Sequence, residues 1–572
     1  MQRYQGLPAS GGVAIGPAWV YRPDVFQTPR RQIEDADAEW RRLTLAREQA
    51  RQQLQALARR AQNAIGADEA AIFEAHQMFL DDVELLGMVE KAIRQQHLNA
   101  EAAVADGFEH YAAMLQALDN DYFRARAQDV RDVKQRLLRI LLGRETASAA
   151  SLDHPAIILA EDLTPSDTIQ FPREYILGLV TVRGGPTSHT AILARALGAP
   201  AAVSVPLDLD AIPADATAAL DGDAGVVIVN PSAETLAQMQ RKQMRWRAAR
   251  ARAAGSAHAP ARTTDGHQVE VVANVGGPED AAQALEMGAE GVGLFRTEFL
   301  YLDRTDMPGE AEQTEVYRQV FELMAGKPVV VRTLDIGGDK PAPYLDVEPE
   351  PNPFLGWRAI RMMDKRPDVL SGQLRALLTA AGQTDADLRI MLPLVSRLEE
   401  LTQARTLLDE ARTELASQGR PLPASVQFGM MVETPAAALL AHHFAQYADF
   451  FSIGTNDLTQ YTLAVDRTNE RVAHLASPYH PAVLRLIAMT IEAAHARGKW
   501  AGLCGELAGD VLAVPLLLGL GLDEFSMAPA AIPQVKEAIR RWSLPRCREI
   551  ARAALALPTT QAVRDYLQEA QP

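Results

Sequence analysis

Residues 428–457 read FGMMVETPAAALLAHHFAQYADFFSIGTND. Two short apolar runs in this stretch, 428–433 and 449–455, are separated by an alanine-rich segment of helical composition. Short, continuous apolar runs bounded by polar residues are typical of buried strands. A buried strand, a helix and another buried strand in succession predict one β-α-β unit of a parallel sheet.

The same alternation continues on both sides of this unit. Six more apolar runs, most of them separated by helical stretches, bring the number of predicted strands to eight. These six are 269–275, 291–299, 328–336, 389–395, 500–506 and 523–529. Eight strands alternating with helices predict a (β/α)8 barrel of the TIM type, which we assign to residues 262–572.

Polar residues gather where the predicted strands end, at the face where such barrels carry their active sites. They are Arg296, Arg332, Asp335, Glu433, Asn456, Asp457 and Cys504. Arg296 and Arg332 end neighbouring strands, and two guanidinium groups at one rim suit a compact dianion such as a phosphate ester. Arg467 could add a third guanidinium and Arg358 a weaker fourth, although any one of them alone would ordinarily form a surface ion pair.

Two carboxylates, an amide and a thiol complete this predicted site. Glu433 and Asp457 follow neighbouring strands and could hold Mg²⁺, which prefers oxygen ligands, or could form salt bridges with the arginines. Asn456 could hydrogen-bond a phosphate or carboxylate oxygen of a substrate. Cys504 could move a proton to or from a substrate carbon, or it could be an ordinary buried cysteine.

The first part of the chain has a different pattern. Residues 146–232 contain short apolar runs and turns, as in a compact α/β domain, whereas residues 21–145 are largely helical. We expect the extended residues 1–20 to join the α/β domain, which makes the helical domain an insertion. The predicted strands in the α/β domain are 156–160, 176–182, 201–205 and 224–229, and the later helices of the insertion are 68–95, 99–118 and 121–142.

The motif GGPTSHT at residues 184–190 places His189 at the start of a predicted helix, 188–198. Glycines let backbone N–H groups approach phosphate oxygens, and a helix N-terminus favours added negative charge. Three hydroxyl residues could cap the helix or hydrogen-bond the ring, namely Thr187, Ser188 and Thr190. The motif therefore suits a histidine that is phosphorylated.

The two halves are joined by residues 233–261. Residues 233–253 predict one exposed helix, and AGSAHAPA at 254–261 has the small-residue and proline content of a flexible connection. We therefore expect a linker helix followed by a hinge.

Composition limits the partners and the location. The net charge of −16 over 572 residues argues against non-specific nucleic-acid binding and permits a basic protein partner. Two cysteines form no disulfide framework, no apolar run approaches the roughly 20 residues that span a membrane, and residues 1–20 lack the pattern of a signal peptide. The expected location is the cytoplasm.

Residues 67–90 contain seven Asp or Glu and no Lys or Arg, with apolar residues interleaved. This stretch is either a solvated helix face above an ordinary core or an acidic-rimmed apolar patch for a basic partner. The acidic residues are Asp68, Glu69, Glu74, Asp81, Asp82, Glu84 and Glu90, and the apolar ones are Ile72, Phe73, Met78 and Phe79.

Taken together, these motifs resemble those of Enzyme I of the phosphoenolpyruvate:sugar phosphotransferase system, and the resemblance covers essentially the whole chain. The motifs are GGPTSHTAILAR at 184–195, GVGLFRTEFLYLDR at 291–304, VRTLDIGGDK at 331–340, NPFLGWRAIR at 352–361, MVETPAA at 431–437, SIGTNDLTQY at 452–461 and GLCGELAGD at 502–510. DYFRARAQDVRDVKQRLLR at 121–139 resembles the helix that precedes the family's α/β domain.

The resemblance implies a phosphate relay from phosphoenolpyruvate through the chain's own histidine to the carrier protein HPr. The implied roles are His189 as the nucleophile that takes phosphate on Nε2; Arg296, Arg332, Arg467, Asn456 and Asp457 as substrate-binding residues; Glu433 and Asp457 as Mg²⁺ ligands; and Cys504 as the acid that protonates the enolate of pyruvate. It also implies that HPr docks on the helical insertion and that the barrel forms a homodimer. One departure is Pro186, which stands where the family usually has a basic residue and could stiffen the loop while removing a phosphate contact.

Two other kinds of protein share parts of this pattern. Pyruvate phosphate dikinase and phosphoenolpyruvate synthase have similar histidine and barrel motifs, but they carry an ATP-binding domain ahead of the histidine domain. Here that region is helical and has no Walker-type loop. A regulatory protein that only senses phosphoenolpyruvate would not need the complete set of His189, Glu433, Asp457 and Cys504.

Overall fold

The computed structural model divides into two compact units, Met1–Ala249 and Arg250–Pro572. It describes the chain except residues 23–25, 27, 65–72, 74–75, 118–120, 145–151, 186–187, 303, 305, 338–342, 346–349, 351, 468, 470–471 and 572. Side chains are also left undescribed at 60–64, 117, 121–125, 189, 196 and 343.

The first unit contains an eight-stranded mixed sheet with the strand order β1-β8-β7-β3-β4-β5-β6-β2. The strands are β1 Gln2–Gln5, β2 Leu7–Ser10, β3 Val13–Val20, β4 Ala156–Ala160, β5 Ile176–Thr181, β6 Ala201–Val203, β7 Thr217–Asp221 and β8 Val226–Val229. β3 pairs in parallel with β4 and antiparallel with β7, so the N-terminal segment returns to the α/β domain as predicted. The sequence reasoning missed β7, because its sequence TAALD is rich in alanine, a residue of low strand propensity.

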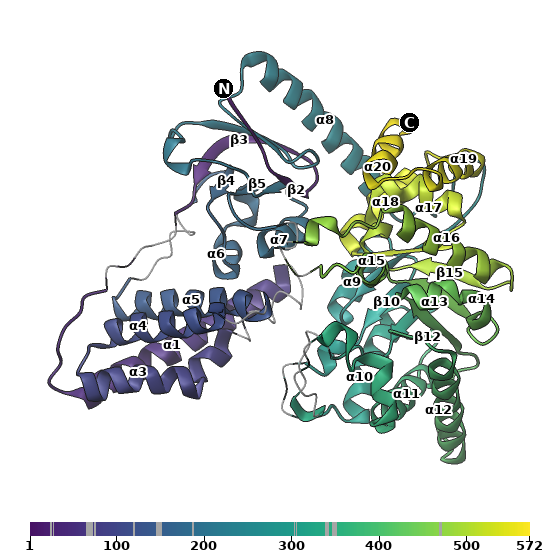
Figure 1. Ribbon diagram of the computed structural model, residues 1–572, viewed down its shortest axis with the longest axis horizontal. Helices are drawn as coiled ribbons and strands as arrows, with labels where there is room; N and C mark the ends of the chain where they lie inside the picture. The colour runs from purple at the N-terminus through teal and green to yellow at the C-terminus, as the bar shows by residue number, and fades with distance from the viewer. Residues whose placement is uncertain are drawn as a thin grey trace. The chain divides into compact units, whose positions relative to one another are not determined.

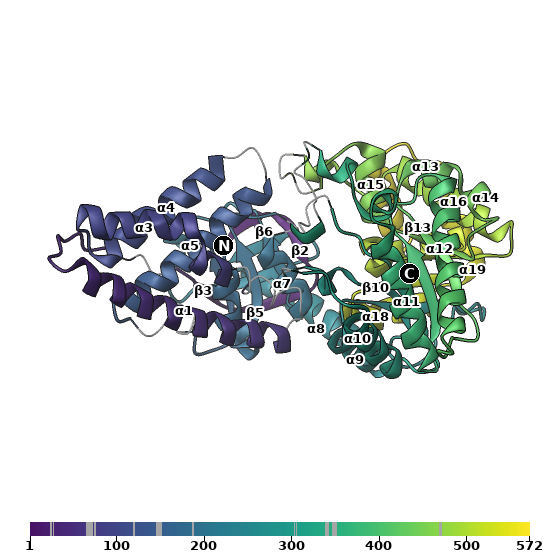
Figure 2. The same ribbon diagram turned by 90° about the horizontal axis from the view of Figure 1, so that it is seen from below.

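Helices make up most of the described part of the insertion between β3 and β4, and the longer ones lie side by side in both views of the molecule (Figures 1 and 2). They are α1 Ala36–Ala64, α3 Val83–Gln96, α4 Ala100–Ala117 and α5 Asp121–Leu141. One apolar stripe of α1 is buried, with Leu43, Ala50, Leu54 and Leu57 in one core. After α5, Gly143 has a φ of 66°, a left-handed conformation that suits glycine and ends the helix.

The single helix predicted over 68–95 is wrong in its described part. Asp82 has extended backbone and its side chain accepts a hydrogen bond from the N–H of Leu85 at 2.8 Å, so a new helix begins there. The run of acidic residues concealed this cap, because Asp81 and Asp82 are consecutive and only the second one has the capping role.

The second unit contains a closed barrel of eight parallel strands, as predicted. They are β9 Glu270–Val275, β10 Val292–Arg296, β11 Pro328–Arg332, β12 Asp387–Leu392, β13 Gln427–Val432, β14 Phe450–Ile453, β15 Trp500–Leu503 and β16 Glu524–Met527. β16 pairs with β9 in the register Phe525↔Val271, which closes the barrel. Closure leaves no sheet edge, and it brings the ends of all eight strands to one rim.

Helices surround the barrel and cover the outer face of its strands (Figure 2). They are α9 Pro278–Glu286, α10 Glu310–Leu323, α11 Pro367–Gly382, α12 Leu398–Ser417, α13 Pro435–Leu439, α14 Ala441–Phe444, α15 Thr455–Leu463, α16 Pro481–His495, α17 Val514–Leu520, α18 Ile532–Ile539, α19 Leu544–Leu555 and α20 Thr560–Glu569. The main core lies between helices and strands, and a smaller apolar cluster fills the barrel interior.

The predicted linker helix is α8, Ala233–Gly255 (Figure 1). The following segment, expected to be flexible, is instead held on the barrel. Arg540 donates hydrogen bonds to the backbone carbonyls of Ser256, Ala259 and Pro260, and the buried Lys536 donates to that of Ala257. The hinge prediction is therefore corrected at 254–261, since these carbonyls are fixed by the second unit, whose boundary lies within α8.

No helix among the residues with described structure is both long and apolar enough to cross a membrane.

Candidate functional site

The histidine motif lies where β5 leads into a short helix, α7 His189–Leu197. Ser188 is the residue before the helix, and its Oγ accepts a hydrogen bond from the N–H of Ala191 at 3.4 Å. His189 is thus the first residue of the helix, where backbone N–H groups point outward and favour an anion. Its side chain, and residues Pro186 and Thr187, lie outside what the structure describes.

The loop before His189 is braced by hydroxyl groups. Ser204 donates a hydrogen bond to the carbonyl of Gly184 at 2.6 Å, and Thr181 donates one to the carbonyl of Arg183 at 2.7 Å. Gly184 has a φ of 90°, a left-handed conformation that a side chain would strain. Of the hydroxyls proposed to cap the helix, Ser188 has that role, and Thr190 is buried in the core instead.

The two rim arginines are partners in the sheet register, because Arg296 pairs with Arg332 at the ends of β10 and β11. Arg296 is exposed, whereas Arg332 is buried. Arg332 forms ion pairs with Glu298 at 2.6 Å and with Asp335 at 3.3 Å. Its burial lowers the pKa of Arg332, but the surrounding carboxylates, Glu298 first, outweigh that effect and raise it, so the guanidinium stays charged.

Arg358 is more central than the sequence suggested. It forms a two-pronged pair with Asp335, with Nε–Oδ1 at 2.8 Å and Nη2–Oδ2 at 2.9 Å, and it also reaches Asp457 at 3.2 Å. Burial lowers the pKa of Arg358, but nearby carboxylates, Asp335 first, raise it by more. Arg358 therefore holds the carboxylates in place, and its position in a loop between predicted strands gave no sign of this role.

Arg467 lies on the other side of Asp457, with Nη2 at 3.2 Å from Oδ1 of that carboxylate. Its side chain is 36% exposed, in contrast to those of Arg332 and Arg358. The structure therefore brings Arg467 into the predicted cluster, in a position that solvent or a ligand can reach.

Glu433 follows β13 directly and is buried. Its Oε1 accepts a hydrogen bond from the N–H of Leu394 at 2.5 Å. Burial, followed by the neighbouring charges of Asp457 and Asp335, raises the pKa of Glu433 well above its usual range. The protonated form of Glu433 is therefore favoured, and a cation bound beside Glu433 and Asp457 would favour the ionised form.

These carboxylates fit a magnesium ion. Oδ1 of Asp457 is buried and makes no hydrogen bond within the described residues, although Arg467 lies nearby. No group of three or more His, Cys, Asp or Glu side chains in the described part of the chain is arranged around a metal position. Mg²⁺ is commonly held by only one or two carboxylates together with substrate phosphate and water, so the pair Glu433 and Asp457 meets that requirement.

Asn456 and Asp457 lie in the first turn of α15, which begins at Thr455 just after β14. Oδ1 of Asn456 accepts a hydrogen bond from the N–H of Glu506 at 3.2 Å, so this amide ties the segment after β14 to the segment after β15. Because the hydrogen bond to Oδ1 fixes the amide plane, it also fixes the direction of the NH₂ group. That group can donate hydrogen bonds to an anion at the rim.

Cys504 follows β15 and is 4% exposed. Its thiol lies 3.8 Å from the carbonyl oxygen of Ile453. Burial raises the pKa of Cys504 to about 11, and the nearby Ser452 side chain lowers it by less. The side chain is therefore a thiol at neutral pH, which suits a proton donor better than a nucleophile.

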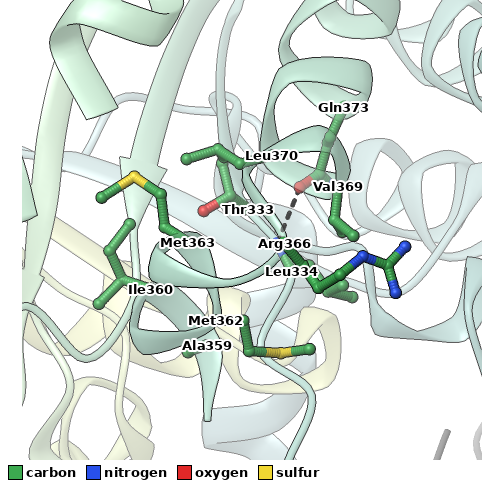
Figure 3. Close-up of a pocket in the computed structure, with 10 residues that line it drawn as sticks. All are labelled: Thr333, Leu334, Ala359, Ile360, Met362, Met363, Arg366, Val369, Leu370 and Gln373. Carbon is green, nitrogen blue, oxygen red and sulfur yellow. Dashed lines mark hydrogen bonds between the residues drawn. The ribbon is translucent and has the colours of Figure 1, made fainter. Parts of the chain in front are cut away.

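A buried amide supports the arginine end of the rim, and sequence reasoning missed it. Oε1 of Gln373 accepts from the N–H of Leu334 at 2.9 Å, the contact drawn in Figure 3. Its Nε2 donates to Thr297 and to Tyr317, each at 3.0 Å, and Thr297 donates to the carbonyl of Arg332 at 2.9 Å. The sequence did contain one indication of this role, because Gln373 is a polar residue on a largely apolar face of α11.

A cavity of about 20 Å³ adjoins this amide, which is room for one water molecule. Thr333, Leu334, Ala359, Ile360, Met362, Met363, Arg366, Val369, Leu370 and Gln373 line it (Figure 3). Its lining is mostly apolar and it is too small for a substrate. We therefore regard it as a packing cavity next to the rim and not as a binding site.

The predicted surface over 67–90 is only partly described, since Asp68, Glu69, Ile72 and Glu74 lie outside the described residues. Phe73 is a core residue, whereas Met78 and Val83 are 66% and 86% exposed. Asp81 pairs with Arg47 and Arg51, and Asp82 caps α3. These two acids are therefore occupied within the domain and do not form an uncompensated acidic rim.

Three family models match the chain in succession. The N-terminal model of PEP-utilising enzymes matches residues 5–126, their mobile-domain model matches 152–225, and their PEP-binding-domain model matches 250–544. The three matches follow the helical insertion, the α/β domain and the barrel.

Whole-length relatives agree with these matches. The chain is 45% identical over 562 residues to the phosphoenolpyruvate-protein phosphotransferase of Geobacillus stearothermophilus, covering 98% of this chain and 97% of the relative. It is 44% identical over 569 residues to the protein of the same name from Bacillus subtilis (strain 168), covering 100% of both. The protein of that name from Staphylococcus carnosus (strain TM300) is 44% identical over 568 residues, covering 99% of both.

Proposed function

The chain belongs to the phosphoenolpyruvate-protein phosphotransferase family, Enzyme I of the sugar phosphotransferase system, and from this premise we propose which of its residues carry out each step. The observation that carries the proposal is the rim of the closed barrel, where guanidinium groups, buried carboxyl groups and a protonated thiol lie at the ends of neighbouring strands. This set matches the needs of phosphoenolpyruvate, which has two anionic groups and a carbon to be protonated.

We assign the binding of phosphoenolpyruvate to Arg296, Arg332, Arg467, Asn456 and Asp457. Two features support this assignment. Arg296 and Arg332 are register partners, which sets their guanidinium groups on adjacent strands, and Arg467 is accessible beside Asp457. Planar guanidinium groups bind phosphate and carboxylate oxygens in pairs, so the rim can hold both ends of the substrate.

Glu433 and Asp457 are the residues that would hold Mg²⁺. When bound, Mg²⁺ supplies positive charge that neutralises substrate phosphate and carboxylate oxygens. Arg358 orients Asp457 from the opposite side, and the N–H of Leu394 orients Glu433, so both carboxylates are fixed before any ligand arrives.

His189 is the proposed acceptor of the phosphoryl group. Its position as the first residue of α7 supports this, since the helix terminus stabilises the charge of a phosphohistidine. Cys504 then gives its proton to the carbon of the enolate that remains, and pyruvate leaves. Because burial keeps Cys504 protonated, the proton is available at the start of the reaction.

The proposed recipient of the phosphate is the carrier HPr, docked on the helical insertion. The exposed apolar side chains of Leu45, Met78 and Val83 support a protein-binding face on this domain. We also propose that the protein works in the cytoplasm, where HPr would meet it.

We propose that the barrel forms a homodimer through α13, α14 and α16. Exposed apolar side chains collect on these helices or in the short segments that follow them, and the helices pack against one another. They are Leu439, Leu440, Tyr447 and Met489. Sedimentation of the full-length protein at several concentrations tests this, and Leu440→Lys with Met489→Lys should shift the equilibrium towards the monomer.

The reaction also needs motion between the units. In-line transfer requires the nucleophile within roughly 3–3.5 Å of phosphorus, and the same histidine must later reach a carrier. We propose that the first unit moves relative to the barrel by bending before Ser256, because residues 256–260 are held by Arg540.

One experiment tests the central assignment. The protein is incubated with phosphoenolpyruvate and Mg²⁺, digested under neutral conditions that preserve phosphohistidine, and mapped by mass spectrometry. A phosphoryl group on the peptide containing His189 is expected, and a phosphoryl group on any other residue would refute the proposal.

A further inference from the structure

The backbone of Cys504 is held on both sides of its Cα atom. Its N–H donates a hydrogen bond to the carbonyl of Ile453 on β14 at 3.1 Å. The register between β15 and β16 ends one residue earlier, where Leu503 pairs with Phe525. The carbonyl of Cys504 is instead bonded by a side chain, because Nδ2 of Asn274 donates to it at 3.0 Å. Asn274 lies on β9, so this bond reaches past β16 from the strand beyond it.

A serine on the intervening strand orients the Asn274 amide. Oγ of Ser526 donates to Oδ1 of Asn274 at 2.6 Å, and Ser526 is 0% exposed. Gly293 on β10 leaves room for this hydroxyl, since a Cβ atom there would lie 2.5 Å from Oγ of Ser526. An amide turned the other way would place its oxygen against the carbonyl oxygen of Cys504. The two partners together therefore favour the orientation in which Asn274 donates to Cys504.

The peptide group that Asn274 holds is joined to a glycine. A Cβ atom on Gly505 would lie 1.8 Å from Oγ1 of Thr455, so the close approach of α15 excludes a larger residue there. Glycine has more accessible backbone conformations than any other residue. The peptide group between Cys504 and Gly505 could therefore rotate with little resistance, and the hydrogen bond from Asn274 opposes that rotation.

The proposed reaction needs a thiol whose direction is fixed. A thiol is a weak hydrogen-bond donor, and an enolate carbon attracts it less than an oxygen atom would. Sγ of Cys504 lies 3.8 Å from the carbonyl oxygen of Ile453, which is a weak contact. Once the backbone is fixed, the side chain has three staggered positions to choose from. The backbone of Cys504 therefore sets the direction from which the proton arrives.

We propose that Asn274, oriented by Ser526, is the positioning residue that directs the thiol of Cys504 towards one face of the enolate. This rests on the proposed role of Cys504. When the proton moves, the S–H bond breaks and its electron pair stays on sulfur, while the π electrons of the enolate form the new C–H bond. Asn274 takes no part in these bond changes and acts through the carbonyl of Cys504. A misplacement of about 1 Å can cost roughly 100-fold in rate, so the loss of this hydrogen bond is measurable.

The test reads which face of the enolate receives the proton. The full-length protein, Mg²⁺ and HPr are mixed in tritiated water with phosphoenolpyruvate that carries deuterium at one of its two C3 positions. The thiol exchanges its hydrogen with the water, so the methyl group of the pyruvate becomes chiral and its configuration identifies the face. Pyruvate is reduced to lactate as it forms, which prevents exchange of the methyl hydrogens. The wild type should give one configuration.

Asn274→Leu keeps the approximate size of the side chain and lacks both hydrogen bonds. Its kcat should fall by roughly 10- to 100-fold while KM for phosphoenolpyruvate stays close to that of the wild type, because the thiol is misdirected and the substrate site is intact. Both configurations of the methyl group should appear, since water then protonates the enolate from either face. A role in stability alone would leave the configuration unchanged.

Two further variants locate the effect. Ser526→Ala keeps Asn274 but removes the hydroxyl that orients it, so kcat and face selectivity should fall in the same direction by a smaller amount. Gln427→Ala is the control, because this amide accepts a hydrogen bond from Nε1 of Trp500 at 2.9 Å, where β13 and β15 begin. It should keep the wild-type rate and one configuration. The dissociation constant of phosphoenolpyruvate, measured for each variant, shows that the protein is folded.

The outcomes separate this inference from the proposed function. One configuration at any rate in Asn274→Leu or in Ser526→Ala overturns the positioning role, and Ser526→Ala decides the matter if Asn274→Leu does not fold. Both configurations in Cys504→Ala support the role of Cys504, whatever the other two variants show. One configuration at the wild-type rate in Cys504→Ala removes that role, and the inference about Asn274 with it.

Discussion

Arg358 reaches Asp457 across the barrel rim, with Nη2 at 3.2 Å from Oδ2, while its other nitrogen holds Asp335. One buried cation therefore joins two segments that are 99 residues apart in the chain. Removing it leaves Asp335, Asp457 and Glu433 close together without their main compensation.

We expect Arg358→Met to lower the free energy of unfolding by about 3–5 kcal/mol, the usual cost of breaking a buried ion pair from one side. Chemical denaturation at pH 7.5 measures this. Arg361→Met is the matched control, since Arg361 bonds only backbone carbonyls of the same loop in the described contacts and should cost under about 1 kcal/mol. Equal losses of unfolding free energy in both variants would show that the ion pairs of Arg358 with Asp335 and Asp457 contribute no particular stability.

We expect His189→Ala to abolish phosphorylation of the protein while the affinity for phosphoenolpyruvate changes by less than about twofold. The reason is that the histidine and the arginine–carboxylate rim belong to different units of the chain. Isothermal titration with phosphoenolpyruvate and Mg²⁺, together with phosphate mapping, measures both properties. His154→Ala changes another histidine of the first unit, which pairs with Asp153 at 2.7 Å, and should retain phosphorylation. Phosphate uptake by His189→Ala would refute the assignment.

Cys504→Ala should retain binding of phosphoenolpyruvate and Mg²⁺ but form pyruvate about 100-fold more slowly, because the enolate loses its proton donor. The measurement is the rate of pyruvate formation in the presence of HPr, with the dissociation constant of phosphoenolpyruvate determined separately. Cys547→Ala is the control, since Cys547 is buried in the outer core of the barrel and takes no part in the rim. A parallel loss of binding and turnover in Cys504→Ala would indicate a structural role instead.

Glu524 gives a prediction for the pH dependence of stability. Its folded pKa is raised from 4.5 to about 8 by burial, so its neutral form is favoured in the folded state. That contribution is fully present below pH 4.5 and is lost as the pH rises towards 8, by about 1.4 kcal/mol for each pH unit in that window. We therefore expect the wild type to lose a few kcal/mol between pH 5 and 8 that Glu524→Gln does not lose.

Denaturation curves at several pH values test this expectation. Glu549→Gln is the control, because its side chain is 57% exposed and pairs with Arg546 at the surface. Identical pH profiles for the wild type and Glu524→Gln would show that the buried carboxyl does not titrate as described.

The barrel could be predicted within a few residues because parallel strands buried on both faces appear as continuous apolar runs. The positions of Arg296, Arg332, Glu433 and Cys504 followed from the same pattern, since each one ends or follows a strand. Which of these groups contact one another could not be predicted, because contacts across the rim depend on the three-dimensional register. Arg358 illustrates this, as its partners lie in the segments that follow two other strands.

In the segment 254–261, by contrast, the sequence predicted a property that the structure does not have. Its composition indicates flexibility, yet its backbone carbonyls are held by Arg540 and Lys536, about 280 residues later in the chain. Small residues allowed this contact, because Ala257 and Ala261 fit closely against the barrel and are buried. The composition of a segment indicates which backbone conformations it can adopt. It does not show whether a side chain elsewhere in the chain holds the segment in one of them.

Arg540 therefore provides the last prediction. Arg540→Ala should increase hydrogen–deuterium exchange in residues 253–262, because the carbonyls of Ser256, Ala259 and Pro260 lose their donor and the segment opens more often. Exchange measured by mass spectrometry should rise about tenfold there and remain unchanged in the barrel strands. Arg541→Ala is the control, since the described ion pair of that neighbour is with Glu537 of α18 and not with the linker. If exchange at 253–262 is already fast in the wild type, or unaltered in Arg540→Ala, the segment is flexible after all and the bend between the two units extends through it.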